Sequence, residues 1–306
     1  MTAPGGPVLG LPLDRLFALY LAVAAVALLF PHRPGAWPVL LALHVLAIAV
    51  AWPMPPIQHS LAGARPGIRR VIRGTADWLP LLLIPLLYTE LAVLNRAVHD
   101  GRYFDTMIIA WEQLLFRSQP SQEWAAAAPY LWLSEPLHAA YLSYYFIIFG
   151  PPLLLFLRGR TDAFRRVAFA VMLSFFAHYL FFIYFPVQGP RYLFPAPGGE
   201  LAAGPFYQVA HRVLEAGSAQ GAAFPSSHVG VSVTMTLMVI RHLPRLAPLI
   251  GALTAGLAFG AIYGGFHYAI DAVAGLILGA FVWLAARPLY DRLLSQSRGL
   301  SVPAAP

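Results

Sequence analysis

The sequence predicts an all-α fold, a polytopic membrane helical bundle of about eight transmembrane helices. Two observations lead to this prediction. Only 11% of the 306 residues are charged and 59% are hydrophobic, whereas a soluble domain has about 25% charged residues. Stretches 136–157, 167–190 and 246–270 contain no Asp, Glu, Lys or Arg. Each is long enough to cross the hydrocarbon core of a bilayer, which takes roughly 20 apolar residues.

Eight apolar runs give the predicted spans in order. The first, with its uninterrupted apolar stretch from Leu16 to Phe30, is too long for a cleaved signal peptide and is followed by more spans. We expect Pro151 and Pro152 to kink the fourth, since proline removes a helix hydrogen bond. The predicted spans cover about 13–31, 37–53, 77–96, 132–157, 163–186, 226–244, 246–264 and 267–288.

Two long connections separate these spans. In 97–131, apolar residues recur every three or four positions with Asp105, Glu112 and Arg117 among them, which predicts an amphipathic helix at the membrane interface. In 187–225, which is rich in Gly, Pro and Ala, a short helix is predicted near 205–216.

The basic residues indicate how the bundle is oriented. All 20 are arginines, and the predicted topology places 14 of them on the side of the two tails and 6 on the side of the long connections. The positive-inside rule then makes both termini cytoplasmic and turns the long connections outward. Because these arginines flank spans, the net charge of +7 does not indicate a nucleic-acid partner. The absence of cysteine excludes disulfides and thiol chemistry.

Three short outward segments carry the candidate chemistry. In the last of them, His267 and Asp271 are four residues apart at a helix start and share a face. The carboxylate can fix the imidazole tautomer and leave the other ring nitrogen to move protons. The alternative is a structural pair that ties the helix end to a neighbour.

The second segment places His228 at the start of a helix. Pro225 precedes it, and Ser226 or Ser227 can cap that helix. Free amides and the helix dipole favour a phosphate there, which His228 could attack. An incidental histidine in a capping turn is the alternative. In the first segment, Arg191 could clamp phosphate oxygens or serve as an interfacial anchor.

The order of Arg191, Pro-Ser-x-His and His-x-x-x-Asp resembles the type 2 phosphatidic acid phosphatase and vanadium haloperoxidase superfamily. The resemblance covers roughly 77–288 and implies a six-helix core, with 1–76 as two additional spans and 289–306 as a cytoplasmic tail. It further implies that His228 is a nucleophile that forms a phosphohistidine, that His267 is the acid and base, and that Asp271 orients His267. Arg191, with the backbone around Ser226 and Ser227, would bind phosphate, and neither metal nor cofactor would be needed.

Two phosphate-binding cations of that pattern are missing here. Tyr184 stands at the usual lysine position, and Gly260-Ala261 replaces the usual Ser-Arg. The reduced set, together with Phe224 to His228 and, more weakly, 111–121, resembles the branch of inositol phosphorylceramide synthase. That resemblance implies transfer of a phospho-headgroup, such as phosphoinositol, from a phospholipid donor to a lipid or polyol alcohol.

The alternatives are hydrolysis, with water as acceptor, of phosphatidic acid or a prenyl (di)phosphate, and a non-enzymatic lipid transporter. Polar residues gathered at one membrane face argue against a transporter, whose sites lie near the midplane. The spans and the missing cations argue against a haloperoxidase. Packing residues are the usual role of a histidine inside a span, but four polar residues remain candidates for the substrate pocket, namely Tyr184, His178, Tyr144 and Tyr145.

Overall fold

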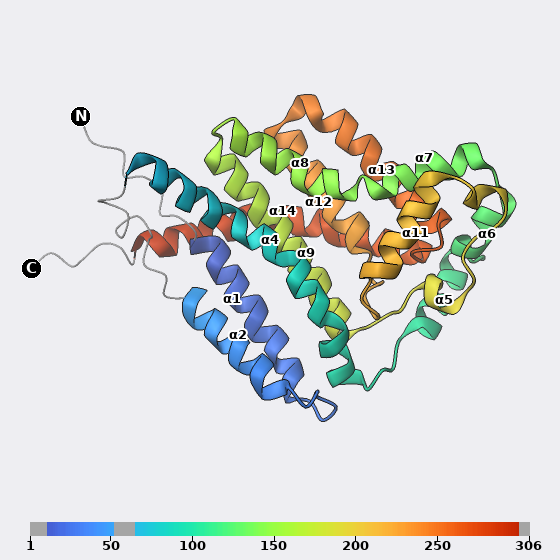
Figure 1. The fold of residues 1–306 in the computed structure, drawn as a ribbon, viewed down its shortest axis with the longest axis horizontal. Coiled ribbons are helices and arrows are strands. Elements are labelled where there is room, and N and C mark those ends of the chain that lie inside the picture. The colour runs from blue at the N-terminus through green and yellow to red at the C-terminus, as the bar shows by residue number, and fades with distance from the viewer. Residues whose placement is uncertain (1–10, 52–64, 300–306) are drawn as a thin grey trace, which may run out of the picture.

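A computed structural model of the protein describes residues 11–51 and 65–299, and Figure 1 shows these residues as an assembly of helices. No strand occurs in these two ranges; an isolated β-bridge joins Val187 to Ala222. The helices are α1 (Leu11–Ala25), α2 (Trp37–Ala51), α4 (Pro66–His99), α5 (Asp105–Phe116), α6 (Pro120–Ala127), α7 (Leu131–Leu142), α8 (Tyr144–Leu157), α9 (Thr161–Tyr184), α10 (Pro190–Leu193), α11 (Pro205–Gly217), α12 (Ser227–His242), α13 (Ala247–Tyr263) and α14 (Ala269–Gly299), with 3-10 turns η1 (Val26–Leu29), η2 (Glu200–Ala202) and η3 (Pro244–Leu246).

The prediction of an all-α polytopic membrane bundle is confirmed. By length and composition, five helices of the described ranges can cross a membrane, or six if α7 and α8 form one bent span. The number eight is not reached, because α2 and α12 are shorter, with 15 and 16 residues. The predicted end of the second span, at residues 52 and 53, lies outside the described residues.

The predicted kink at Pro151 and Pro152 stays a prediction. Both prolines lie inside α8, and a bend of 43° lies before them at Ser143, between α7 and α8. The Ser143 hydroxyl donates to the carbonyl of Ala140 and so occupies an acceptor at the end of α7. This bend determines how α7 and α8 approach the start of α12.

Two helices run beyond the predicted spans. Helix α4 begins at Pro66, eleven residues before the expected start, and α14 continues to Gly299. The expected tail 289–306 is therefore helical as far as it is described. Hydropathy detects only the apolar part of a helix, whereas arginine and glutamine are also good helix formers. The short helix predicted near 205–216 is confirmed as α11.

Helices α12 and α14 pack at very short range through glycine. A Cβ atom on Gly279 would overlap the backbone of Gly230, and one on Gly275 would overlap the carbonyl of Ser226. Small residues of this kind let membrane helices approach closely. Helix α9 lies against both, and Phe169, Met172 and Phe182 are among its fully buried residues. The tight pairing fixes the N-terminal ends of α12 and α14 next to each other.

Candidate active site

The two candidate histidines lie beside each other where α12 and α14 begin. His228 is the second residue of α12, and His267 lies two residues before α14. Their ring centroids are 5.7 Å apart. The structure thus brings together two segments that are about 40 residues apart in the sequence. At this separation both rings can contact one bound group, as a shared site requires.

Asp271 connects both segments from a fully buried position. Its Oδ2 atom lies 3.4 Å from His267 Nδ1 and accepts a hydrogen bond of 2.9 Å from the Tyr268 amide. Its backbone carbonyl accepts from the Ser226 amide at 2.9 Å. The carboxylate is therefore held by its own helix start, and the contact with His267 is the longer of its two hydrogen bonds. Oδ1 has no hydrogen-bond partner within the described ranges.

The start of α12 is capped as the sequence predicts. Ser226 is the N-cap residue, and its hydroxyl accepts a hydrogen bond from the Val229 amide. Ser227 is buried and hydrogen-bonds through its side chain to Tyr144. The free backbone amides at this helix start can donate to a phosphate.

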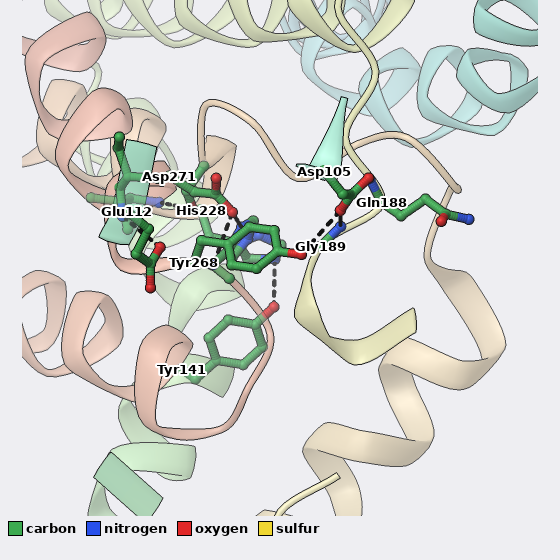
Figure 2. A network of polar contacts seen from close by, with 12 residues as sticks. Asp105, Glu112, Tyr141, Gln188, Gly189, His228, Tyr268 and Asp271 are labelled. Carbon is green, nitrogen blue, oxygen red and sulfur yellow. Dashed lines mark hydrogen bonds and ion pairs between the residues drawn. The ribbon is translucent and has the colours of Figure 1, made fainter. Parts of the chain in front are cut away.

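Two tyrosines surround the His228 ring, one on each side of the bend at Ser143. The Tyr141 hydroxyl lies 3.3 Å from His228 Nε2, as Figure 2 shows, and the two rings are stacked at 5.0 Å. The Tyr144 ring lies 4.3 Å from the His228 ring. The bend therefore lets successive helices hold one imidazole. Tyr141 was not among the candidates from the sequence, because nothing in a span of apolar residues marks one tyrosine among several.

Arg191 lines a neighbouring cavity and makes no hydrogen bond to either histidine among those described. Its Nη1 atom donates to the Ser218 hydroxyl at 2.8 Å, and its guanidinium stands 4.9 Å from the Tyr192 ring. It lines a cavity of about 390 Å³ together with Phe266, the neighbour of His267. Among the described residues, Arg191 is the one arginine in this lining.

Burial and charge keep His267 neutral. Burial is the main cause that lowers its pKa, to about 4, and the positive charge of Arg191 acts in the same direction, while a hydrogen bond to the Ala223 carbonyl opposes both. At neutral pH the imidazole is therefore a base. A bound phosphate, being negative, would raise this pKa and favour the protonated form that a leaving group needs.

Helix α5 supplies two buried carboxylates that support the site. Asp105 accepts hydrogen bonds from the amides of Gln188 and Gly189, both at 2.9 Å, and from the Tyr268 hydroxyl at 3.2 Å. Figure 2 shows this connection between the segment of Arg191 and the segment of His267. A single carboxylate thereby fixes the two segments relative to each other.

Glu112 is the second carboxylate of α5 and is fully buried. It accepts a hydrogen bond from the Ile270 amide at the start of α14. Burial raises the pKa of Glu112 to about 7, against the opposing effect of amides that include those of Ile270 and Ala269. Asp105 and Glu112 are seven residues apart and so share one helix face. That spacing was the available signal, but the sequence predicted only an amphipathic helix at the membrane interface and placed neither carboxylate in the site; the structure exposes Leu114 and Leu115 of this helix.

The remaining pocket candidates are dispersed. His178 is fully buried, and its Nδ1 donates a hydrogen bond of 2.6 Å to the carbonyl of Ser174 in its own helix. Its ring also approaches Gly230 of α12. The Tyr184 hydroxyl donates to the Val23 carbonyl of α1. Tyr145 is half exposed and contacts the Tyr144 ring. Of the four, only Tyr144 touches His228 in the contacts described.

Comparison with known proteins places the chain in a family. A search of curated proteins and a search of solved structures gave no significant match. The family profile of the PAP2 superfamily matches residues 106–285, which is 180 of the 306 residues. The matched range contains α5 from its second residue on and all three candidate segments. With more than half of its length matched, this chain belongs to the PAP2 superfamily.

Proposed function

We propose that the protein transfers the phospho-headgroup of a phospholipid to an alcohol, through a phosphohistidine on His228. Members of the PAP2 superfamily are phosphatases or phosphotransferases that act on lipid phosphates, and this chain is an enzyme of that kind in the membrane. The choice of transfer over hydrolysis, and the roles of single residues, are the proposal. The observation that carries it is the His228–His267 pair beside a cavity with a single arginine.

In the first step, a ring nitrogen of His228 attacks the phosphorus of a phosphodiester. The N–P bond forms as the P–O bond to the lipid alcohol breaks, and the imidazolium of His267 gives its proton to the departing oxygen. Tyr141 and Tyr144 hold the attacking ring. Asp271 orients His267 and stabilises its charged form, the role that a carboxylate has beside a catalytic imidazole.

In the second step, an acceptor hydroxyl attacks the same phosphorus. Neutral His267 takes the hydroxyl proton, the new P–O bond forms, and the N–P bond to His228 breaks. The enzyme returns to its starting state, with His228 neutral and His267 protonated. The proton that His267 donates in the first step is thus recovered in the second, as a transfer cycle requires.

The charge of the site supports a diester substrate. A phosphate monoester carries nearly two negative charges at neutral pH and a diester carries one, and unpaired charge is costly away from water. Within the described part of the chain, Arg191 is the one arginine that lines the cavity beside His267, and the backbone amides at the start of α12 add partial positive charge. This set balances about one charge. A diester also leaves a substituted phosphoryl group on His228, which an alcohol can accept.

The cavity beside His267 supports an acceptor with several hydroxyl groups. Its lining includes Gln122, Arg191, His211 and Glu215 along with Phe266. These side chains can donate to and accept from a polyol, whereas an acyl chain would leave them unpaired. A sugar alcohol or a lipid with a polyol head would fit this chemistry.

The decisive experiment compares donors and acceptors with the purified enzyme in detergent. Phosphatidylinositol or phosphatidylglycerol is supplied with a labelled alcohol, and phosphatidic acid is supplied in parallel. We expect faster turnover of the diester, with the label in a new phosphodiester. If phosphatidic acid or a prenyl diphosphate reacts faster and inorganic phosphate is the main product, transfer is refuted and the enzyme is a phosphatase. Added EDTA should leave the rate unchanged, whereas a loss restored by a divalent ion would make the histidines metal ligands.

We also propose that the site faces away from the cytoplasm, with both termini inside. The support is the distribution of arginines, 14 to 6, in the predicted topology. Reporter fusions at the C-terminus and within the 187–225 connection should give opposite signals. A cytoplasmic signal from the connection would reverse the orientation.

A further inference from the structure

A second cavity, of about 460 Å³, lies at the end of the bundle opposite the histidines. The lining comes from the start of α9, the end of α12 and the second half of α14, including Met238 and Tyr290. His228 and His267 stand where α12 and α14 begin, so the same helix pair carries a cavity near each end. The chemistry proposed above does not use this second cavity.

The mouth of this cavity is basic. Arg166, Arg241 and Arg287 line it, with Asp291 as its one carboxylate among the described residues, which gives a net charge of three minus one, or +2. Asp291 is paired at 2.8 Å with Arg166 and stands 3.9 Å from Arg287. Arg241 is exposed and has no hydrogen bond or ion pair within the described ranges. Among the described residues, Arg241 is thus unpaired, and Arg287 is near only Asp291, which is already paired with Arg166.

An apolar track continues from the basic mouth toward the middle of α14. Trp283 and Leu284 line the cavity. Ile277, Phe281 and Leu284 follow at helical spacing and are each more than 60% exposed. Residues spaced by four and three positions form one continuous stripe along a helix. A basic cavity that opens onto an apolar stripe is complementary to an amphiphile with an anionic head.

We propose that this cavity binds one phospholipid with an anionic headgroup, whose phosphate lies between Arg241 and Arg287 and whose acyl chain follows the α14 stripe. Basic pockets between membrane helices bind such headgroups in other proteins. A free phosphate would leave the stripe unused, and a zwitterionic lipid would bring a cation to the arginines. The bound lipid joins the ends of α9, α12 and α14 and stabilises the helix pair that carries the histidines.

The test uses the full-length His228→Ala protein, so that the lipid is not consumed whatever the reaction is. Phosphatidylglycerol, phosphatidylcholine with the same chains, and glycerol phosphate are each titrated in a neutral detergent. The His228→Ala protein is the parent, and the double variants R241Q/R287Q and R158Q/R245Q, the second as the matched control, are made in it. The melting temperature and the apparent Kd are recorded for all three proteins. Arg158 and Arg245 are exposed residues outside the lining, so the control loses the same charge.

We expect phosphatidylglycerol to raise the melting temperature of the parent and the control, and its Kd to weaken about tenfold or more in R241Q/R287Q. The variant R241K/R287K keeps the positive charge and should retain most of the binding. It serves as the control that substitution at these two positions does not by itself disrupt the cavity. Equal shifts in both glutamine variants would refute the site. Equal shifts with phosphatidylcholine would refute the headgroup assignment, and equal shifts with glycerol phosphate would make this a site for free anions. None of these outcomes depends on the transferase proposal.

Discussion

The two ends of the α12–α14 pair differ in how deeply their ionisable side chains are buried. At the N-terminal end, His267 is 5% exposed and Asp271 is fully buried, and backbone amides supply much of their hydrogen bonding. Near the other end, Arg287 and Asp291 have side chains that are 66% and 46% exposed. Each is free to exchange its partner for water or a lipid head.

This difference in burial indicates at which end activity and stability depend on single side chains. A buried charge without its partner costs several kcal/mol, whereas an exposed pair contributes about 0–1 kcal/mol. We therefore expect substitutions at the buried end to abolish activity or stability, and substitutions at the exposed end to be nearly silent unless a ligand is present. Five variants test this contrast, from the largest effect to the smallest.

His228→Ala should reduce turnover by roughly a thousandfold or more, because no covalent intermediate can form. The rate of product formation from a labelled phospholipid measures the loss. His32→Ala is the matched control, since His32 is exposed and pairs only with exposed Asp100 among the contacts described. Substantial turnover by folded His228→Ala protein would exclude the phosphohistidine.

Asp271→Asn should lower kcat by roughly 10²–10⁴-fold while the protein remains folded. The amide oxygen can still accept from the Tyr268 amide, but it cannot stabilise a protonated His267. Steady-state kinetics, with circular dichroism as a check of folding, measure the effect. Asp291→Asn at the exposed end should leave kcat unchanged, and equal losses in the two variants would remove the special role of Asp271.

Arg165→Gln should cost about 3–5 kcal/mol of folding stability, because it leaves Asp77 buried without its partner. Arg165 donates two hydrogen bonds to Asp77, at 2.9 and 3.3 Å, and both side chains are nearly buried. Thermal or denaturant unfolding in detergent measures the change. A loss below about 1 kcal/mol would mean that water reaches the pair.

Glu112→Gln should change how stability depends on pH. Burial raises the pKa of Glu112 from 4.5 to about 7, so the folded protein binds this proton more tightly than the unfolded chain does. The wild type should therefore lose stability as pH rises from about 4.5 to above 7, where the buried carboxylate ionises. Glutamine does not titrate, so its advantage over the wild type should grow with pH. Melting temperatures at pH 5 and pH 8 give the comparison, and an advantage that shrinks with pH would contradict the burial of an ionising group.

Arg166→Gln should have the smallest effect, at about 0.2–1 kcal/mol. Its ion pair with Asp291 is short, at 2.8 Å, but the side chains are 35% and 46% exposed. The same unfolding assay compares it directly with its neighbour Arg165. Losses of similar size in the two variants would mean that exposure does not separate the two classes of charge.

The local signals of the sequence were reliable where they rest on short-range physics. Apolar runs identify membrane helices because a bilayer demands a minimum length of apolar residues. Ser226 caps α12 as its position after Pro225 predicts. The spacing of His267 and Asp271 put them on one side of a helix start, and their contact follows directly. The orientation of the bundle and the catalytic roles stay predictions.

What the sequence by itself determined is the helical membrane fold, the three segments and the low cationic charge around them. The tertiary structure decided which distant residues complete the site. Asp105 joins the segments of Gly189 and Tyr268 across more than 80 residues, and Tyr141 and Tyr144 both reach His228 from the two sides of the bend at Ser143. Such contacts depend on the packing of helices. A buried amide must have a hydrogen-bond partner, and the packing decides which carboxylate or hydroxyl lies close enough to accept from it. No pattern of neighbouring residues carries that information.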